Sequence, residues 1–191
     1  FNLAGVFHEL DDFDAAVESY QNAILLEPSY AEAHNNLGNV YRDSSKIESA
    51  IESYKKAILI KPDYLEAHYS LGTSYYELGN LKEAVKCYEQ VLELRPNLTG
   101  TLNNLGNILI KQGKIIEAEN CYKQSIKLKK ENPEAHNNLG VALQRQGKNE
   151  EAKISYEQAL IYRNNYAEAH YNLAYCHRKL GNVDQALEGY K

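Results

Sequence analysis

Histidines and cysteines are the residues of this chain that could bind a metal or react, and both recur at a fixed spacing. Four histidines lie at multiples of 34 residues from one another, namely His34, His68, His136 and His170. Zinc requires ligand nitrogens within about 2.1 Å of the ion, whereas equivalent residues on neighbouring packed helices lie roughly 10 Å apart. We therefore predict that these histidines have packing roles and that the chain binds no metal or other cofactor.

The cysteines give a similar result. Cys87 and Cys121 are also 34 residues apart, a spacing that argues against a disulfide, whose Cα atoms lie within about 7 Å. Cys176 aligns with Val40 and Ala142, so we expect it to be buried. No Ser-His-Asp or Cys-His arrangement, phosphate-binding loop or pair of catalytic carboxylates can be assembled, because the polar residues repeat in register instead of converging. We predict no catalysis within this segment.

A column of asparagines, named here the Asn36 column, shows a different pattern. Its members precede a recurring leucine by one residue, and they are Asn2, Asn36, Asn104, Asn138 and Asn172, with Ser70 in the remaining repeat. This register turns them away from a core that contains the leucine, although asparagine is a mediocre helix former. An amide donates and accepts hydrogen bonds, so it can bind a peptide backbone of any sequence. We predict a peptide-binding column; the alternatives are asparagines inherited by duplication without a task, or a local packing role.

Charged residues form two further columns. One lies near the starts of the same segments and consists of Glu32, Glu66, Glu134 and Glu168. The other, named the sign-changing column, reads Glu9, Asp43 and Glu77, and then Lys111, Arg145 and Lys179. The change of sign predicts a groove that is acidic in its N-terminal half and basic in its C-terminal half. Helix dipoles also favour acids at helix starts and bases at helix ends, so both interpretations remain open.

All these columns are positioned by a repeat of 34 residues. Near copies of the hexapeptide AHNNLG at residues 33–38 begin at residues 67, 101, 135 and 169. Within residues 65–98, apolar residues spaced three and four apart predict two helices on either side of a turn at Gly79-Asn80. Such a period is typical of a stacked solenoid. We predict a single array over residues 1–191, with repeats at 1–30 (partial), 31–64, 65–98, 99–132, 133–166 and 167–191 (partial).

Three apolar columns predict how these helices pack. Leucines equivalent to Leu37 are expected between the two helices of each repeat. Alanines are expected where helices cross closely, at Ala16, Ala50, Ala84, Ala118, Ala152 and Ala186. Tyrosines are expected to fill the gap to the next repeat, at Tyr20, Tyr54, Tyr88, Tyr122, Tyr156 and Tyr190. We also expect the helix before Asn132-Pro133 to run on slightly, with Asn132 as the N-cap of the next helix.

The combination of Leu37, Gly38, Ala50, Tyr54 and Pro62, repeated throughout, resembles the tetratricopeptide repeat over the whole chain. The early tryptophan of that family is replaced by histidine in four repeats and by leucine in one. The recurring Asn-Leu-Gly, with Pro-x-Tyr-x-Glu-Ala ahead of it in two repeats, resembles most closely the repeats of the protein O-linked N-acetylglucosamine transferase group.

These resemblances imply an all-α, right-handed superhelical solenoid. They also imply that the Asn36 column lines a concave groove and grips a peptide backbone. Chaperone-binding members of this fold clamp a C-terminal carboxylate with lysine and arginine. Here the matching inward positions are Asn35, Asn36, Glu66 and Ser70, so that activity is not expected.

Composition limits the possible partners. The formal net charge is −5, and residues 1–64 carry eleven acidic against five basic residues. No basic stripe with interleaved aromatic residues is present, so we predict no nucleic-acid partner. No apolar run is long enough to span a bilayer, and we predict no membrane partner. The three cysteines have no paired spacing, which favours reduced thiols and an intracellular, cytoplasmic setting.

The predicted function is a protein-interaction scaffold that binds an extended peptide or partner segment in its concave groove. One alternative is the substrate-recognition arm of a protein glycosyltransferase with its catalytic domain outside this segment. Another is a structural spacer in a multi-subunit assembly. The sequence starts and stops within its repeat pattern and contains no methionine, so we expect an excerpt of a longer protein.

Overall fold

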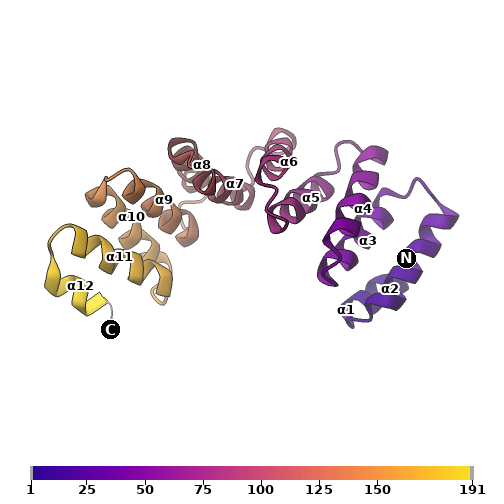
Figure 1. Ribbon diagram of the computed structural model, residues 1–191, viewed down its shortest axis with the longest axis horizontal. Coiled ribbons are helices and arrows are strands. Elements are labelled where there is room, and N and C mark those ends of the chain that lie inside the picture. Colours follow the sequence, from indigo (N-terminus) through magenta and orange to yellow (C-terminus); the bar gives the residue numbers. More distant parts are fainter. Residues whose placement is uncertain (1, 190–191) are drawn as a thin grey trace. The chain divides into compact units, whose positions relative to one another are not determined.

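The computed structural model describes residues 2–189, with the side chains of residues 3–188, and these residues are almost entirely α-helical (Figure 1). The chain divides into two compact units, Phe1–Pro96 and Asn97–Lys191. The first contains α1 (Asn2–Glu9), α2 (Phe13–Leu26), α3 (Ala31–Asp43), α4 (Ile47–Ile60), α5 (Leu65–Glu77) and α6 (Leu81–Leu94). The second contains α7 (Thr99–Lys111), α8 (Ile115–Leu128), α9 (Pro133–Arg145), α10 (Asn149–Tyr162), α11 (Ala167–Lys179) and α12 (Val183–Gly189).

In each unit the helices pack in pairs, and the pairs pack in sequence. The first unit pairs α1 with α2, α3 with α4 and α5 with α6, while α2 packs on α3 and α4 on α5. The second pairs α7 with α8, α9 with α10 and α11 with α12, while α8 packs on α9 and α10 on α11. The first helices of neighbouring pairs also touch, α3 with α5, α7 with α9 and α9 with α11. The surface along each row of first helices is named here the first-helix face.

The turn within each pair uses a left-handed residue, as the sequence predicted. Gly79 and Gly147, for example, have φ of 76° and 80°, which glycine adopts readily because it lacks a Cβ. In the first two turns Asp11 and Ser45 take the same conformation, with φ of 59° and 62°. A residue with a Cβ pays roughly 1 to 2 kcal/mol in that region, so these two turns are the less favourable ones.

One predicted helix end was correct and another was wrong. Asn132 caps α9, since its side chain accepts a hydrogen bond from the Ala135 amide at 3.1 Å and Pro133 occupies the first turn. The preceding helix does not run on, because α8 ends at Leu128, the repeat equivalent of Leu94 at the end of α6. The next residue is extended in both cases, with φ of −140° at Lys129 and −146° at Arg95. The same extended residue therefore ends the helix whether or not a proline follows.

The alanine and glycine columns bring the helices close together. All six alanines of the column are at most 3% exposed. A Cβ added to Gly106 or Gly140 would lie 2.5 Å from the ring of Tyr122 or Tyr156, the tyrosine of the same helix pair. The tyrosines fill the gap to the next repeat as expected, since Tyr20 clusters with Leu37 and Tyr54 clusters with Leu71. The rings of Tyr54, Tyr88, Tyr122 and Tyr156 also lie on the glycine of their own pair, a contact that the sequence did not predict. Tyr190 lies outside the described residues.

The tyrosine hydroxyls are hydrogen-bonded in the first helices. Tyr54 donates to Asn39 Oδ1 at 2.8 Å, and Tyr122 donates to Asn107 Oδ1 at 2.7 Å. Burial raises the pKa of Tyr54 to about 12, an effect that a hydrogen bond with Ser70 of the next pair partly opposes. Each tyrosine is therefore a core residue of its own pair whose polar tip reaches the first-helix face.

The leucine column is buried inside the array, but against the preceding pair, whereas the sequence predicted a place between the two helices of its own repeat. Leu37 clusters with Ala16 and Tyr20 of the pair before it, and Leu71 clusters with Ile51 and Tyr54. Leu37, Leu71, Leu105 and Leu139 are 6 to 9% exposed, whereas Leu3 is 60% exposed. Leu3 differs because no helix precedes α1 in the described residues to cover it. The column therefore depends on contacts from both sides of each pair.

Candidate binding site on the first-helix face

The structure places one member of the Asn36 column on each first helix from α3 to α11. Asn36 and Ser70 lie on α3 and α5 of the first unit, and Asn104, Asn138 and Asn172 lie on α7, α9 and α11 of the second. All five are partly exposed and none is fully so. The side chain of Asn2 lies outside the described residues. The column thus follows the row of first helices, but more of each side chain is covered than its register predicts.

Two members of the column join neighbouring first helices. Asn138 Nδ2 donates to Asn107 Oδ1 at 3.0 Å, and Asn172 Nδ2 donates to Asn137 Oδ1 at 3.0 Å. Asn36 shares a hydrogen bond with the hydroxyl of Tyr20 on the preceding pair. These bonds agree with the local packing alternative. An amide has two donor hydrogens and an acceptor oxygen with two lone pairs, so one such bond leaves hydrogen-bonding capacity for a ligand.

A second, deeper column was missed as a binding candidate. Asn35, Asn103 and Asn137, named here the Asn35 column, precede the first column by one residue and are 5%, 3% and 0% exposed. The doubled Asn-Asn in three repeats was the available signal, but only the residue next to the leucine was predicted to bind. Buried amides need partners because an unpaired polar atom loses its hydrogen bonds to water.

The three members of the Asn35 column differ in how they are paired. Asn137 donates to Asn138 Oδ1 at 3.4 Å and to Glu168 Oε1 at 3.2 Å, and its oxygen accepts from Asn172. In contrast, the Oδ1 atoms of Asn35 and Asn103 are buried without a hydrogen-bond partner. An unpaired buried acceptor costs roughly 1 to 3 kcal/mol. These two oxygens are therefore the acceptors of the Asn35 column that the free chain leaves unsatisfied.

The sign-changing column is distributed over local contacts. Asp43 pairs with His8 at 2.9 Å and with Arg42 at 3.3 Å, and Arg145 donates to the Ile110 carbonyl at 3.3 Å near the end of α7. Lys179 lies 5.5 Å from the ring centre of Tyr175. Glu9 and Glu77 are exposed, as is Lys111. The Arg145 contact agrees with the helix-dipole interpretation, and a groove with two oppositely charged halves stays a prediction.

The histidine column fixes the chain between repeats. Each Nε2 lies within hydrogen-bonding distance of the carbonyl oxygen six residues earlier, at 3.1 Å for His34, 2.8 Å for His68, 2.9 Å for His136 and 2.7 Å for His170. Burial lowers the pKa of His136, which favours the neutral ring with its proton on Nε2. Among the described residues, no three His, Cys, Asp or Glu side chains are grouped to hold a metal ion.

All three cysteines are free thiols. Cys87 and Cys176 are buried, and burial raises the pKa of Cys87 to about 11 and also raises the pKa of Cys176. Cys176 Sγ donates a hydrogen bond to the Asn149 carbonyl at 3.0 Å. A thiol with a raised pKa is a poor nucleophile because little thiolate forms near neutral pH, so packing explains both residues.

Comparison with known proteins agrees with this architecture. The family model for the C-terminal domain of cilia and flagella-associated protein 70, a tetratricopeptide-repeat domain, matches residues 2–191. The chain belongs to this family. No curated protein sequence matches it. No helix in the described part of the chain is both long and apolar enough to cross a membrane.

Solved structures share the fold at low sequence identity. MamA is 24% identical with a TM-score of 0.82, covering 88% of this chain and 98% of MamA. YrrB, described as a TPR protein with an unusual peptide-binding site, is 24% identical with a TM-score of 0.77, covering 91% of this chain and 90% of YrrB. A tetratricopeptide repeat protein from Parabacteroides merdae is 19% identical with a TM-score of 0.86, covering 98% of this chain and 75% of that one.

At these identities the likeness shows the fold alone, and it confirms the predicted all-α repeat solenoid. The narrower resemblance to the O-linked N-acetylglucosamine transferase group, and with it the glycosyltransferase alternative, receives no support from the family model or from these structures. The family instead supports the coarser prediction, a role in protein interaction.

Proposed function

We propose that the first-helix face binds an extended segment of a partner protein, and that the two asparagine columns contact its backbone. The observation that carries this proposal is the pair of buried, unpaired amide oxygens on Asn35 and Asn103. Peptide N–H groups are the donors that every extended segment offers at regular intervals. If the two amides turn toward the first-helix face when a segment binds, the segment completes hydrogen bonds that the free chain lacks.

The Asn36 column complements these acceptors. Its amide hydrogens can donate to the carbonyl oxygens of the same segment, since each Nδ2 carries two hydrogens and Asn138 and Asn172 each use one. A neutral hydrogen bond contributes a net 0.5 to 1.5 kcal/mol, roughly. Several such bonds along a unit would give useful but modest affinity with little dependence on the sequence of the segment.

The comparisons support this kind of partner. YrrB, which shares the fold, has a peptide-binding site, and the family is named for a protein associated with cilia and flagella. A protein of a ciliary assembly is accordingly the first partner to look for. The sign-changing column would then select among such segments by charge, with acidic residues toward the N-terminus and basic residues toward the C-terminus.

The test uses a peptide selected from a displayed random library against the wild-type chain, followed by fluorescence anisotropy with variants. Asn103→Leu should weaken binding by about tenfold, which corresponds to the loss of one well-formed hydrogen bond of roughly 1.4 kcal/mol. Replacing Asn36, Asn104, Asn138 and Asn172 together by alanine should abolish it. Both losses should persist in high salt because amides carry no charge.

Asn103→Leu is the sharper test of the two, because the quadruple variant also removes the hydrogen bonds by which Asn138 and Asn172 join neighbouring helices. Unchanged peptide affinity in a folded Asn103→Leu chain would rule out the Asn35 column as a binding element. Undiminished binding by a folded quadruple variant would rule out the Asn36 column and move the site elsewhere.

A further inference from the structure

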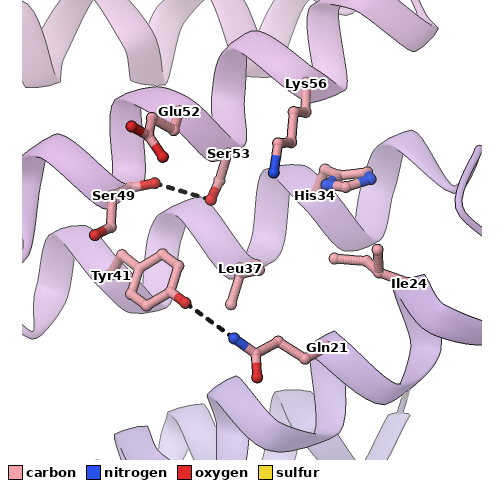
Figure 2. A pocket seen from close by; sticks show the side chains of 9 residues that line it. All are labelled: Gln21, Ile24, His34, Leu37, Tyr41, Ser49, Glu52, Ser53 and Lys56. Carbon is pink, nitrogen blue, oxygen red and sulfur yellow. Dashed lines mark hydrogen bonds between the residues drawn. The ribbon is translucent and has the colours of Figure 1, made fainter.

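A cavity opens between second helices of the first unit, and no residue of the asparagine columns lines it. It has a volume of about 250 Å³ and lies between α2, α3 and α4 (Figure 2). Ile24 and Leu37 are apolar lining residues, and the polar lining residues of α2 and α4 are Gln21, Ser49, Glu52, Ser53 and Lys56. Gln21 Nε2 donates to the Tyr41 hydroxyl at 3.2 Å, which holds the Gln21 side chain across the cavity (Figure 2).

The cavity results from the sequence of the first two repeats. Its equivalent between α4 and α6 has Glu83 in place of Ser49 and Cys87 in place of Ser53. There Glu83 pairs with Lys86 at 2.8 Å, and Lys55, the equivalent of Gln21, lies 5.7 Å from the centre of the Tyr75 ring. Larger, paired side chains thus occupy the next groove, whereas two serines leave this one open.

Exposed leucines adjoin the cavity. Leu25 and Leu26 on α2 are 79% and 87% exposed, and Leu59 on α4 is 82% exposed. Residues three or four apart on a helix are neighbours, so Leu25 stands beside Gln21 and Leu59 stands beside Lys56. Leu26 is not three or four residues from any lining residue of α2, so it does not belong to this surface. The cavity together with Leu25 and Leu59 is named here the second-helix patch.

The fold does not require Leu25 and Leu59. Their column continues as Glu93, Lys127 and Ile161, so a charged residue is compatible with the same position in the same helix. Ile161 follows a lysine in the column and stands singly, whereas Leu25 and Leu59 are consecutive. Exposed apolar residues that adjoin one another and a cavity are typical of an interaction surface, unlike apolar residues scattered singly. The difference between repeats therefore indicates a function at this position in the first unit.

The charges of the patch favour an acidic partner. Residues 55–61 hold three of the five basic residues among residues 1–64. Lys55 lies over Tyr75, and Lys61 pairs with Glu32 at 3.6 Å. Lys56 lines the cavity without an ion pair to the described residues. Glu52 also lines the cavity and lies one turn before Lys56, so it is seven residues from Leu59 whereas Lys56 is three residues from it. The end of the cavity next to Leu59 is therefore the basic one.

We propose that the second-helix patch docks an amphipathic helix of a partner protein that carries acidic residues beside its apolar stripe. A carboxylate of the partner would enter the cavity and accept hydrogen bonds from Lys56. Its aliphatic residues one turn away would cover Leu25 and Leu59. The polar and apolar parts of the patch are themselves one helical turn apart, which matches side chains on successive turns of a docked helix.

The probe is a fluorescein-labelled helical peptide of about 15 residues, built from Leu, Ala and Glu with the leucines on one face. Leu59→Glu copies Glu93 and should weaken binding by about tenfold, because the apolar contact of the leucine is lost and a charge is placed against the apolar stripe of the peptide. Lys56→Gln copies Gln90 and should weaken binding by about threefold, in line with an exposed ion pair. The matched control is Ile161→Glu, in the column of Leu59 but in the second unit and 69% exposed, which should bind as wild type does.

Further arms of the experiment separate other occupants. A peptide with lysine in place of every glutamate should bind at least several times more weakly, and equal binding would overturn the acidic specificity. Probe binding lost in Asn103→Leu but kept in Leu59→Glu would place the peptide on the first-helix face and overturn the proposal. A wild-type dimer that Leu59→Glu converts to a monomer, measured by light scattering without peptide, would assign the patch to a second copy instead.

Discussion

Asn103 and Asn137 are the same residue type in equivalent places one repeat apart, yet only Asn137 is fully paired. Asn172 donates a hydrogen bond to the Asn137 oxygen. Asn138, the repeat equivalent of Asn172, donates instead to Asn107, and the Asn103 oxygen is left unpaired. The next repeat has Val141 in place of Asn107, and valine offers no acceptor. The residue one turn after the buried asparagine, at position 107 or 141, therefore decides whether the oxygen of that asparagine accepts a hydrogen bond.

The first unit reaches the same result by another route. Asn35 is equivalent to Asn137, but Ser70 stands where Asn172 stands in the second unit. Serine has a shorter side chain, and Ser70 shares its hydrogen bond with Tyr54. The Asn35 oxygen is left unpaired as a consequence. An asparagine at a repeated position is structural or available depending on its neighbour, so a change of neighbour should change its role.

The largest expected effect is for Asn137→Leu. This change removes three hydrogen bonds at a fully buried position, so we expect the free energy of unfolding to fall by about 2 to 3 kcal/mol. Urea denaturation followed by circular dichroism measures it. A loss no greater than that of Asn103→Leu would show that the two asparagines are equivalent after all.

Asn107→Val should redirect the Asn138 amide to Asn103. Tyr122 loses its acceptor, so we expect a loss of stability of about 1 to 2 kcal/mol, with weaker peptide binding because Asn103 becomes paired. Asn39→Val is the matched control, since Asn39 also accepts from a tyrosine but has Ser70, which carries no amide, at the place equivalent to Asn138. Asn39→Val should leave peptide binding at Asn35 unchanged, since Ser70 has no amide to redirect. An equal loss of binding in both variants would argue against the redirected bond.

Asn103→Leu should leave the chain as stable as wild type or up to about 1 kcal/mol more stable, because it removes an unpaired buried acceptor. Thermal melting is the measurement. Loss of peptide binding together with a gain in stability would separate a binding role from a structural one. A marked fall in melting temperature would mean that the asparagine supports packing.

Much of the fold could be predicted from the sequence, because a strict period aligns every residue with its equivalents. The turn positions, the buried alanines and the Asn132 cap all came from that alignment. The contacts between each tyrosine and the glycine of its own pair could not be predicted in this way. Gly38 and Tyr54 lie on different helices, and only the three-dimensional packing of the two helices shows that the Tyr54 ring lies on Gly38. The end of α8 was missed because helices were expected to end at a proline, whereas an extended residue ends them.

The candidate site was harder to predict than the fold. The register of Asn36 indicated a surface residue, but the neighbouring helix covers part of it. The pairing of Asn103 and Asn137 depends on Asn138 and Asn172, which lie 35 positions farther along the chain on another helix. Whether these residues form the bonds depends on the directions of their side chains, which the aligned sequence does not show. The deeper Asn35 column was visible in the sequence only as a doubled asparagine.

The smallest expected effect is for Ser70→Asn, which gives the first unit the donor that the second unit has. Asparagine at this position should bond to the Asn35 oxygen, raising the free energy of unfolding by about 0.5 kcal/mol and weakening peptide binding in the first unit. Side-chain amide resonances in a ¹⁵N spectrum would report the new bond. No change in the Asn35 resonance would show that chain length at residue 70 is not what leaves its oxygen unpaired.

The contact between each tyrosine and the glycine of its own pair also affects how fast the chain folds. Gly106 and Tyr122, or Gly140 and Tyr156, are only sixteen positions apart in the sequence, so closing them requires a short loop and little entropy. Chains dominated by such near contacts fold in microseconds to milliseconds. Each pair can therefore reach a hairpin-like nucleus before its neighbours have formed, and folding can begin at several points along the array.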